Sequence, residues 1–146
     1  MEKIARILYA EDSMNDIELT LAAFKEINLV NQVDIVRDGQ EALDYLFYQG
    51  KYSNREKGVP SFVLLDVKMP KLDGIQVLKV IRQSKEYENL PVVMLTSSQM
   101  ETDVFNSYQL GANGFVQKPI EFSEFVMAIK SIGYFWAILN ITPKEQ

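Results

Sequence analysis

Apolar runs and amphipathic stretches alternate along the chain. Five short segments are rich in branched and aromatic residues, and most are almost continuously apolar, as buried strands are. These segments cover residues 4–10, 33–37, 61–66, 91–97 and 114–118. Between and after them, apolar positions recur with helical spacing at 13–27, 39–49, 74–87, 100–110 and 122–139. The pattern predicts five strands that alternate with five helices.

Continuously apolar strands are typical of a parallel sheet that is covered by helices on both faces. Right-handed crossovers then predict a doubly wound (βα)5 fold of the α/β class, with a five-stranded parallel sheet. The polar stretch 50–60 carries Gly at its start and Pro at its end and is expected to be a loop. The length of 146 residues suits one domain, residues 1–146.

The composition narrows the possible chemistry. The chain contains no Cys and no His, which excludes thiolate nucleophiles, zinc–thiolate sites and the Ser-His-Asp arrangement. Carboxylates, hydroxyls, Lys and backbone remain, and such ligands favour a hard cation such as Mg²⁺. The net charge of −5 argues against binding to duplex nucleic acid.

The sequence predicts a cytoplasmic protein. The apolar patch near the N-terminus is too short for a signal peptide, and acidic residues follow it at once. No apolar run approaches the length that a membrane span needs.

Polar residues stand at the carboxyl ends of four predicted strands. They are Glu11-Asp12, Asp66, Thr96-Ser97 and Lys118-Pro119. Taken singly, each has an ordinary explanation as a turn or a helix cap, but in a doubly wound sheet the strand ends form the ligand site. Three carboxylates brought together there repel one another, and a divalent cation such as Mg²⁺ resolves the repulsion.

The same residue types suit phosphoryl transfer. This reaction needs a nucleophile, a metal ion, and cationic and hydroxyl groups for the phosphoryl oxygens. Asp66 could itself be the nucleophile and form an acyl phosphate, because carboxylates serve as covalent phosphoryl acceptors.

Four segments of the chain, in order and at strand ends, resemble the receiver domain of two-component response regulators. They are LYAEDS, LLDVKMPKLDGIQVL, PVVMLTS and GANGFVQKP. The resemblance covers essentially the whole chain and implies the flavodoxin-like receiver fold. It identifies Asp66 as the phosphoacceptor and Asp12 as a direct ligand of Mg²⁺. Glu11 would bind the metal through water, and the backbone carbonyl of Lys68 would be a further ligand.

The resemblance also implies the remaining roles at the site. Thr96 and Lys118 would bind the phosphoryl group, with a cis peptide bond before Pro119. Phe115 occupies the position of the switch aromatic, whose rotamer, together with Thr96, reports phosphorylation. Tyr is frequent at that position in the family. Phe115 has no hydroxyl and therefore cannot form the hydrogen bond that a Tyr there could form. Lys68 is a long cation beside the acceptor that could alter the hydrolysis rate.

A receiver is a signalling module and not a metabolic enzyme, although it catalyses its own phosphoryl transfer and dephosphorylation. The implied partner is a sensor histidine kinase. The long 50–60 loop and the segments SMNDIEL and ALDYLF resemble single-domain receivers paired with bacterial phytochrome histidine kinases. No output domain is expected, so the signal would pass through protein contacts or a phosphorelay.

The C-terminal segment IGYFWAILNI is more apolar than one core-facing stripe requires. Two explanations stay open: a final helix that packs deeply, or a patch buried against a second copy. We favour a homodimer through the fourth and fifth helices. Its expected interface residues are Tyr134, Phe135, Trp136, Ile138 and Leu139.

Other functions fit the sequence less well. An aspartyl-phosphate hydrolase usually has a second Asp two residues after the nucleophile, where this chain has Lys68. No glycine-rich nucleotide-binding loop follows the first strand. A pseudo-receiver, which keeps the fold as an interaction scaffold but is not phosphorylated, is the remaining alternative.

Overall fold

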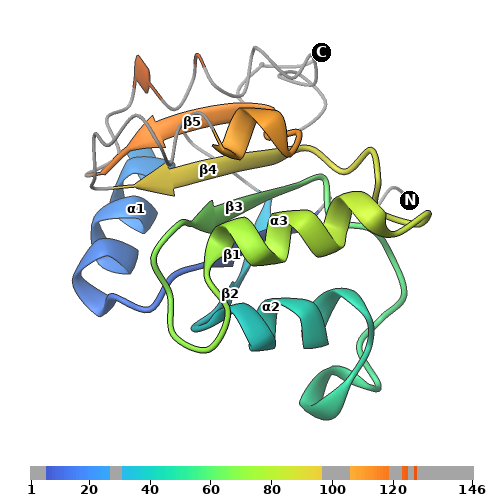
Figure 1. Ribbon diagram of the computed structural model, residues 1–146. Coiled ribbons are helices and arrows are strands. Elements are labelled where there is room, and N and C mark those ends of the chain that lie inside the picture. The colour runs from blue at the N-terminus through green and yellow to red at the C-terminus, as the bar shows by residue number, and fades with distance from the viewer. Residues whose placement is uncertain (1–5, 27–30, 97–105, 119–122, 125–126, 128–146) are drawn as a thin grey trace, which may run out of the picture.

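The structure is a computed structural model that describes residues 6–26, 31–96, 106–118, 123–124 and 127. Figure 1 shows one sheet with helices packed on it. The strands are β1 (Arg6–Ala10), β2 (Gln32–Val36), β3 (Phe62–Asp66), β4 (Val92–Thr96) and β5 (Gly114–Gln117). The helices are α1 (Met14–Glu26), α2 (Gly39–Leu46), the short 3₁₀-helix η1 (Gly50–Tyr52) and α3 (Gly74–Gln83).

The sheet is parallel throughout, with the strand order β2-β1-β3-β4-β5. The chain runs outward from β1 to β2 and then returns across β1 to place β3 on its other side. The order therefore reverses between β1 and β3, and this switch point is where open α/β sheets place their ligands. The predicted doubly wound sheet is confirmed.

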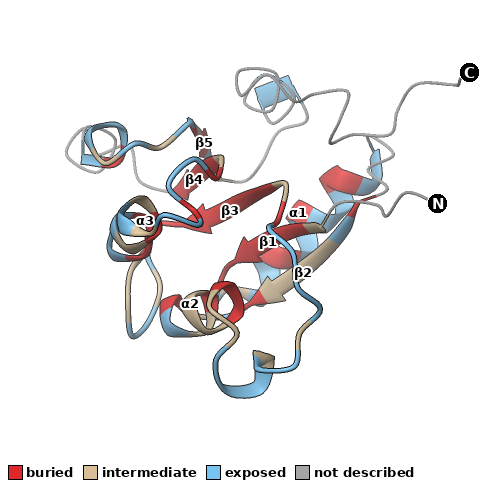
Figure 2. Cartoon of the chain, turned by 90° about the vertical axis from the view of Figure 1, so that its right-hand side faces the viewer, coloured by how far each residue is buried: buried red, intermediate tan, exposed pale blue. Residues whose placement is uncertain are grey.

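The core has two layers, one on each face of the sheet. On one face, Ile17 and Phe24 of α1 pack against side chains of the sheet such as Ile7 and Leu64. On the other face, α2 and α3 cover a larger cluster that includes Leu65 and Met94. Figure 2 shows that β3 and β4 are buried along their lengths, whereas β2, at an edge, is only partly covered.

Two helices end earlier than the sequence pattern predicts. The helix expected over 39–49 ends at Leu46, and the helix expected over 74–87 ends at Gln83. α2 ends just before Tyr48, whose φ of 59° lies in the left-handed region. For α3 the reason lies in Tyr87, which is fully buried, packs edge-on against Phe47 and donates a hydrogen bond to the carbonyl of Leu46. Burying this ring requires the chain to leave the helix after Gln83.

Within α1, the buried stripe differs in part from the expected one. Apolar spacing predicts that Leu21 faces the core with Ile17 and Phe24, but its exposed fraction is 38%. Thr20 is buried instead, because its hydroxyl accepts a hydrogen bond of 3.0 Å from the buried Tyr9 hydroxyl.

The 50–60 segment is a loop apart from η1, and a cation fixes it to the domain. The guanidinium of Arg55 lies 4.0 Å from the ring centroid of Tyr45 and 4.3 Å from that of Tyr48. It also donates a hydrogen bond of 2.8 Å to the Tyr45 carbonyl. The loop is therefore an ordered part of the α2 side of the molecule.

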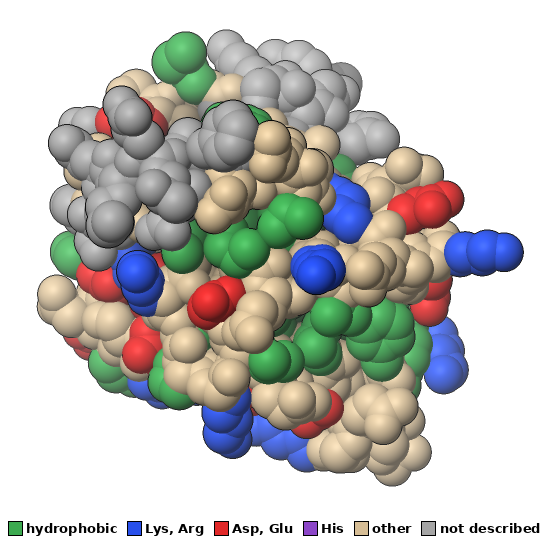
Figure 3. All heavy atoms as spheres, in the orientation of Figure 1, with side chains coloured by type: hydrophobic (Ala, Val, Ile, Leu, Met, Phe, Trp, Pro, Cys, Tyr) green, Lys and Arg blue, Asp and Glu red, His purple; other side chains and the backbone are tan. Residues whose placement is uncertain are grey.

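Acidic and basic side chains are mixed on one face of the molecule. On the face shown in Figure 3, Lys and Arg side chains are interspersed with Asp and Glu. Among the residues that the structure describes, no helix is long and apolar enough to cross a membrane.

Candidate functional site

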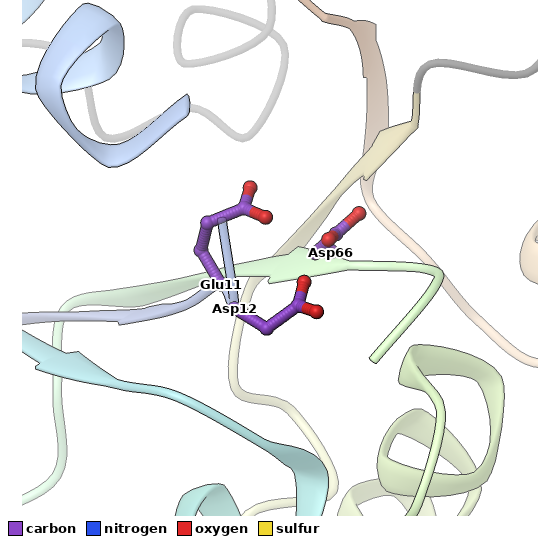
Figure 4. Close-up of side chains that lie close together, drawn as sticks. All are labelled: Glu11, Asp12 and Asp66. Carbon is purple, nitrogen blue, oxygen red and sulfur yellow. The ribbon is translucent and has the colours of Figure 1, made fainter. Parts of the chain in front are cut away.

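The carboxyl ends of β1 and β3 bring three carboxylates together at the switch point. Glu11 and Asp12 follow β1, and Asp66 is the last residue of β3 (Figure 4). A carboxylate oxygen from each of the three lies within 4.8 Å of the other two. Three acidic oxygens at this separation are a fitting ligand set for a hard divalent cation. The convergence predicted for these residues is confirmed.

Glu11 is fully buried and is held by several neighbours. Its Oε2 accepts a hydrogen bond of 3.3 Å from the Ser13 backbone N–H, and the Tyr9 hydroxyl lies 3.4 Å from its Oε1. Asp12 is exposed, and its backbone carbonyl accepts a hydrogen bond of 2.8 Å from Arg37. Glu11 therefore lies inside the protein, and Asp12 lies at its surface.

Lys118, which directly follows β5, supplies the positive charge among these acids. Its backbone N–H donates to the Thr96 carbonyl at 2.7 Å, which ties the end of β5 to the end of β4. Its Nζ lies 3.3 Å from Asp66 Oδ2 and within 3.2 Å of both Glu11 oxygens. It also lies 2.7 Å from Asp16 Oδ2, on the first turn of α1. The side chain is only 9% exposed. Burial acts to lower the pKa of its ammonium, but the carboxylates of Asp16, Asp66 and Glu11 together outweigh burial and raise that pKa.

The environment of Asp66 opposes its ionised form. Burial, followed by the adjoining Glu11 carboxylate, raises the pKa of Asp66 to about 7, although Lys118 acts in the opposite direction. A carboxylate that is buried beside another acid is a poor place for further negative charge. The site therefore favours any cation that reaches it.

The loop after β3 packs closely on the backbone of Asp66. Lys68 has an exposed side chain in this loop. Gly74 starts α3, and its N–H donates a hydrogen bond of 2.8 Å to the Val67 carbonyl. A Cβ at Gly74 would lie 2.2 Å from the carbonyl oxygen of Asp66. Only glycine allows this approach, because the contact is with backbone that cannot turn away.

We therefore expect Gly74→Ala to lower the free energy of unfolding by about 1–3 kcal/mol, the usual cost of overpacking. Urea unfolding measures the loss, and Lys79→Ala, which introduces the same residue at an exposed position of α3, is the control. A variant as stable as this control would contradict the close contact.

Thr96 and Phe115 lie on the neighbouring strands. Thr96 is the last residue of β4 and is buried, at 1% exposure. Phe115 of β5 is half-buried and packs against the ring of Tyr108, with 6.2 Å between the ring centroids. The switch role expected for Phe115 stays a prediction.

Some predicted site residues lie outside the described residues. These are Pro119, with its predicted cis bond, and the predicted dimer residues Tyr134, Phe135, Trp136, Ile138 and Leu139. Asp16 and Tyr9, in contrast, are part of the site but were not singled out from the sequence. Asp16 follows Ser13 by three residues, which is the ordinary spacing of an acid in the first turn of a helix.

The comparison with protein families identifies the family to which the fold belongs. Residues 7–130 match the family described as the response regulator receiver domain. The chain belongs to this receiver family. Receiver-domain response regulators are signalling proteins and not metabolic enzymes, as the sequence predicted.

Several relatives of this receiver are linked to phytochromes. A structure named bacteriophytochrome response regulator RtBRR is 50% identical, with a TM-score of 0.87, and the alignment covers 97% of this chain and 86% of that one. The response regulator Rcp1 of Synechocystis sp. is 36% identical over 130 residues, which are 89% of this chain and 87% of Rcp1.

Two relatives were solved in states that bear on the site. The Mn²⁺-bound form of Rcp1 has a TM-score of 0.75 at 34% identity, with 97% of this chain and 99% of that chain covered. The phosphorylated cyanobacterial phytochrome response regulator RcpA has a TM-score of 0.76 at 36% identity, with 92% of this chain and 95% of that chain covered. The resemblance of this receiver to phytochrome-associated regulators is thereby confirmed.

Proposed function

We propose that this receiver accepts a phosphoryl group on Asp66 from a sensor histidine kinase, in a phytochrome light-signalling pathway. The observation that carries the proposal is the convergence of Glu11, Asp12 and Asp66 within 4.8 Å, with Lys118 Nζ at 3.3 Å from Asp66. The phosphorylated state of RcpA and the phytochrome names of the relatives support it.

The acidic residues fit Mg²⁺. Asp12 and Asp66 would bind the cation directly, Glu11 through water, and Lys68 through its backbone carbonyl. When bound, Mg²⁺ supplies positive charge that offsets the clustered carboxylates and the oxygens of the phosphoryl group. The donors are all oxygens, and burial, followed by the adjoining Glu11 carboxylate, raises the pKa of Asp66 to about 7, an effect that a bound cation would oppose.

The residues of the chain then perform the transfer. An ionised oxygen of Asp66 forms the new bond to phosphorus while the bond from phosphorus to the donor imidazole nitrogen breaks. The electron pair stays on that nitrogen, which takes a proton from solvent. Lys118 and the Thr96 hydroxyl bind the phosphoryl oxygens, and Phe115 follows Thr96 inward, which shifts an existing two-state equilibrium.

The proposal extends to partners. Output would pass through protein contacts, including a homodimer through the fourth and fifth helices, or through a phosphorelay. Binding to nucleic acid is not part of it, because the net charge is −5. We place the protein in the cytoplasm with its kinase, and we treat residues 1–146 as one domain.

The experiment is phosphorylation by acetyl phosphate, followed by intact mass, with Mg²⁺ or with a chelator. We expect one added phosphoryl group on the wild type, only with Mg²⁺, and none on Asp66→Asn. Asp73→Asn is the control, since Asp73 is the N-cap of α3 and does not belong to the carboxylate cluster. If the wild type gains no phosphoryl group, the pseudo-receiver interpretation replaces this one.

A further inference from the structure

Lys118 makes its shortest contact with an acid outside the carboxylate cluster. Its Nζ lies 2.7 Å from Asp16 Oδ2, compared with 3.1 Å from Glu11 and 3.3 Å from Asp66. The ammonium is thus drawn toward α1, away from the residue on which a phosphoryl group would be placed. A charge-assisted contact of 2.7 Å is the strongest kind of hydrogen bond available to it.

Hydrogen bonds hold the backbone of Asp16 and the carboxylate of Glu11 on the α1 side of the site. Asp16 lies in the first turn of α1, where its backbone N–H donates to Ser13 Oγ at 3.2 Å and the helix N-terminus stabilises negative charge. Glu11 is held by Tyr9 and by the Ser13 backbone N–H. The flexible group is the four-carbon side chain of Lys118.

We propose that Asp16 is a positioning residue that holds Lys118 on the α1 side of the site and competes with the phosphoryl group for its ammonium. This inference rests on the proposed function. A phosphoryl group on Asp66 needs the ammonium near its own oxygens, so Lys118 must loosen its contact with Asp16. The competition stabilises the unmodified protein relative to the phosphorylated one.

The competition predicts that removal of the Asp16 charge favours the phosphorylated state. The beryllium fluoride anion BeF₃⁻ is a suitable probe, because it mimics a phosphoryl group on a carboxylate and does not react further. At saturating Mg²⁺, we expect Asp16→Asn and Asp16→Ala to bind it about fivefold to tenfold more tightly than the wild type. Calorimetric titration of the full chain measures this affinity.

The matched control lies on the same helix. Glu18 is an exposed acid of α1, and Glu18→Gln removes the same charge away from Lys118. We expect this variant to bind BeF₃⁻ like the wild type. Equal tightening in Glu18→Gln would show a general effect of net charge and would overturn the inference.

A second pair of variants tests whether Asp16 acts through Lys118. In a Lys118→Ala background, Asp16→Asn should leave the BeF₃⁻ affinity unchanged, because no ammonium remains to be held. If Asp16→Asn raised the BeF₃⁻ affinity equally in that background, the Asp16 carboxylate would act by repelling the anion directly. If the Asp16 single variants bound BeF₃⁻ like the wild type, the contact between Asp16 and Lys118 would be purely structural. Either result overturns the inference and leaves the proposed function intact.

Failure of the proposed function would look different. The wild type would then bind no BeF₃⁻ and gain no phosphoryl group from acetyl phosphate, and both proposals would fall together. The BeF₃⁻ titration and the acetyl phosphate assay together therefore distinguish failure of the inference about Asp16 from failure of the proposed function.

Discussion

Lys118→Ala is expected to lower the free energy of unfolding of the metal-free protein by about 3 kcal/mol at pH 8. Lys118 is the cation that the structure places against the buried Glu11 and Asp66 and the half-buried Asp16. Its removal leaves carboxylates of 0% and 3% side-chain exposure close together without that charge. Breaking a buried ion pair on one side is costly because the remaining charge stays desolvated.

The stability lost in Lys118→Ala should depend on Mg²⁺ and on pH, because both change the charge balance among the buried carboxylates. Mg²⁺ should restore much of the lost stability, because a cation in the site replaces the charge of the missing ammonium and binds only the folded state. Lowering the pH should also restore it, since protonation removes the repulsion between the acids. Urea unfolding with a chelator and with Mg²⁺, at pH 5 and pH 8, measures both effects.

Lys51→Ala is the matched control for this prediction. Lys51 forms an ion pair of 3.0 Å with Glu41, but its side chain is 71% exposed. Exposed pairs contribute about 0–1 kcal/mol, so this variant should change little and should not respond to Mg²⁺. If Lys118→Ala cost no more than Lys51→Ala, the buried charge cluster would not have the energetic role assigned to it.

The sequence predicts the sheet and most of the site for a clear physical reason. The run that ends at Asp66 is continuously apolar because β3 is buried on both faces, and parallel strands bring their carboxyl ends to one edge. This logic places Asp66, Thr96 and Lys118 together without any side-chain detail. Residues that act at strand ends are therefore predictable from local pattern and chain order alone.

The contacts that could not be predicted depend on side chains that meet across elements. The pairing of Lys118 with Asp16 requires that the end of β5 lie beside the first turn of α1, and no local pattern contains that information. The early end of α3 likewise depends on where Tyr87 finds its partner, the Leu46 carbonyl. In both places a tertiary interaction decides among conformations that the local sequence permits.

Asp66→Asn should raise the stability of the metal-free protein, and the gain should grow with pH. Burial and the neighbouring Glu11 raise the pKa of Asp66 to about 7 in the folded protein, from an ordinary value of 3.8. The folded state holds this proton more tightly than the unfolded chain does. The contribution of Asp66 to the free energy of unfolding is therefore fully present below about pH 4 and is lost as the pH rises through 7. The wild type should lose stability across this range, and Asn cannot ionise.

We expect a gain of about 2–3 kcal/mol for Asp66→Asn at pH 8, since one unit of pKa shift corresponds to about 1.4 kcal/mol and Lys118 retains part of its contact with Asn. The variant and the wild type should be nearly equal at pH 4. Urea unfolding in a chelator from pH 4 to pH 8 measures the difference, with the exposed Glu18→Gln as a control that should show little change. Saturating Mg²⁺ should reverse the order at pH 8, because the cation stabilises the wild type and binds weakly to Asn. If the difference in the free energy of unfolding between the two proteins were the same at all pH values, ionisation of Asp66 would not be what limits the stability of the metal-free protein.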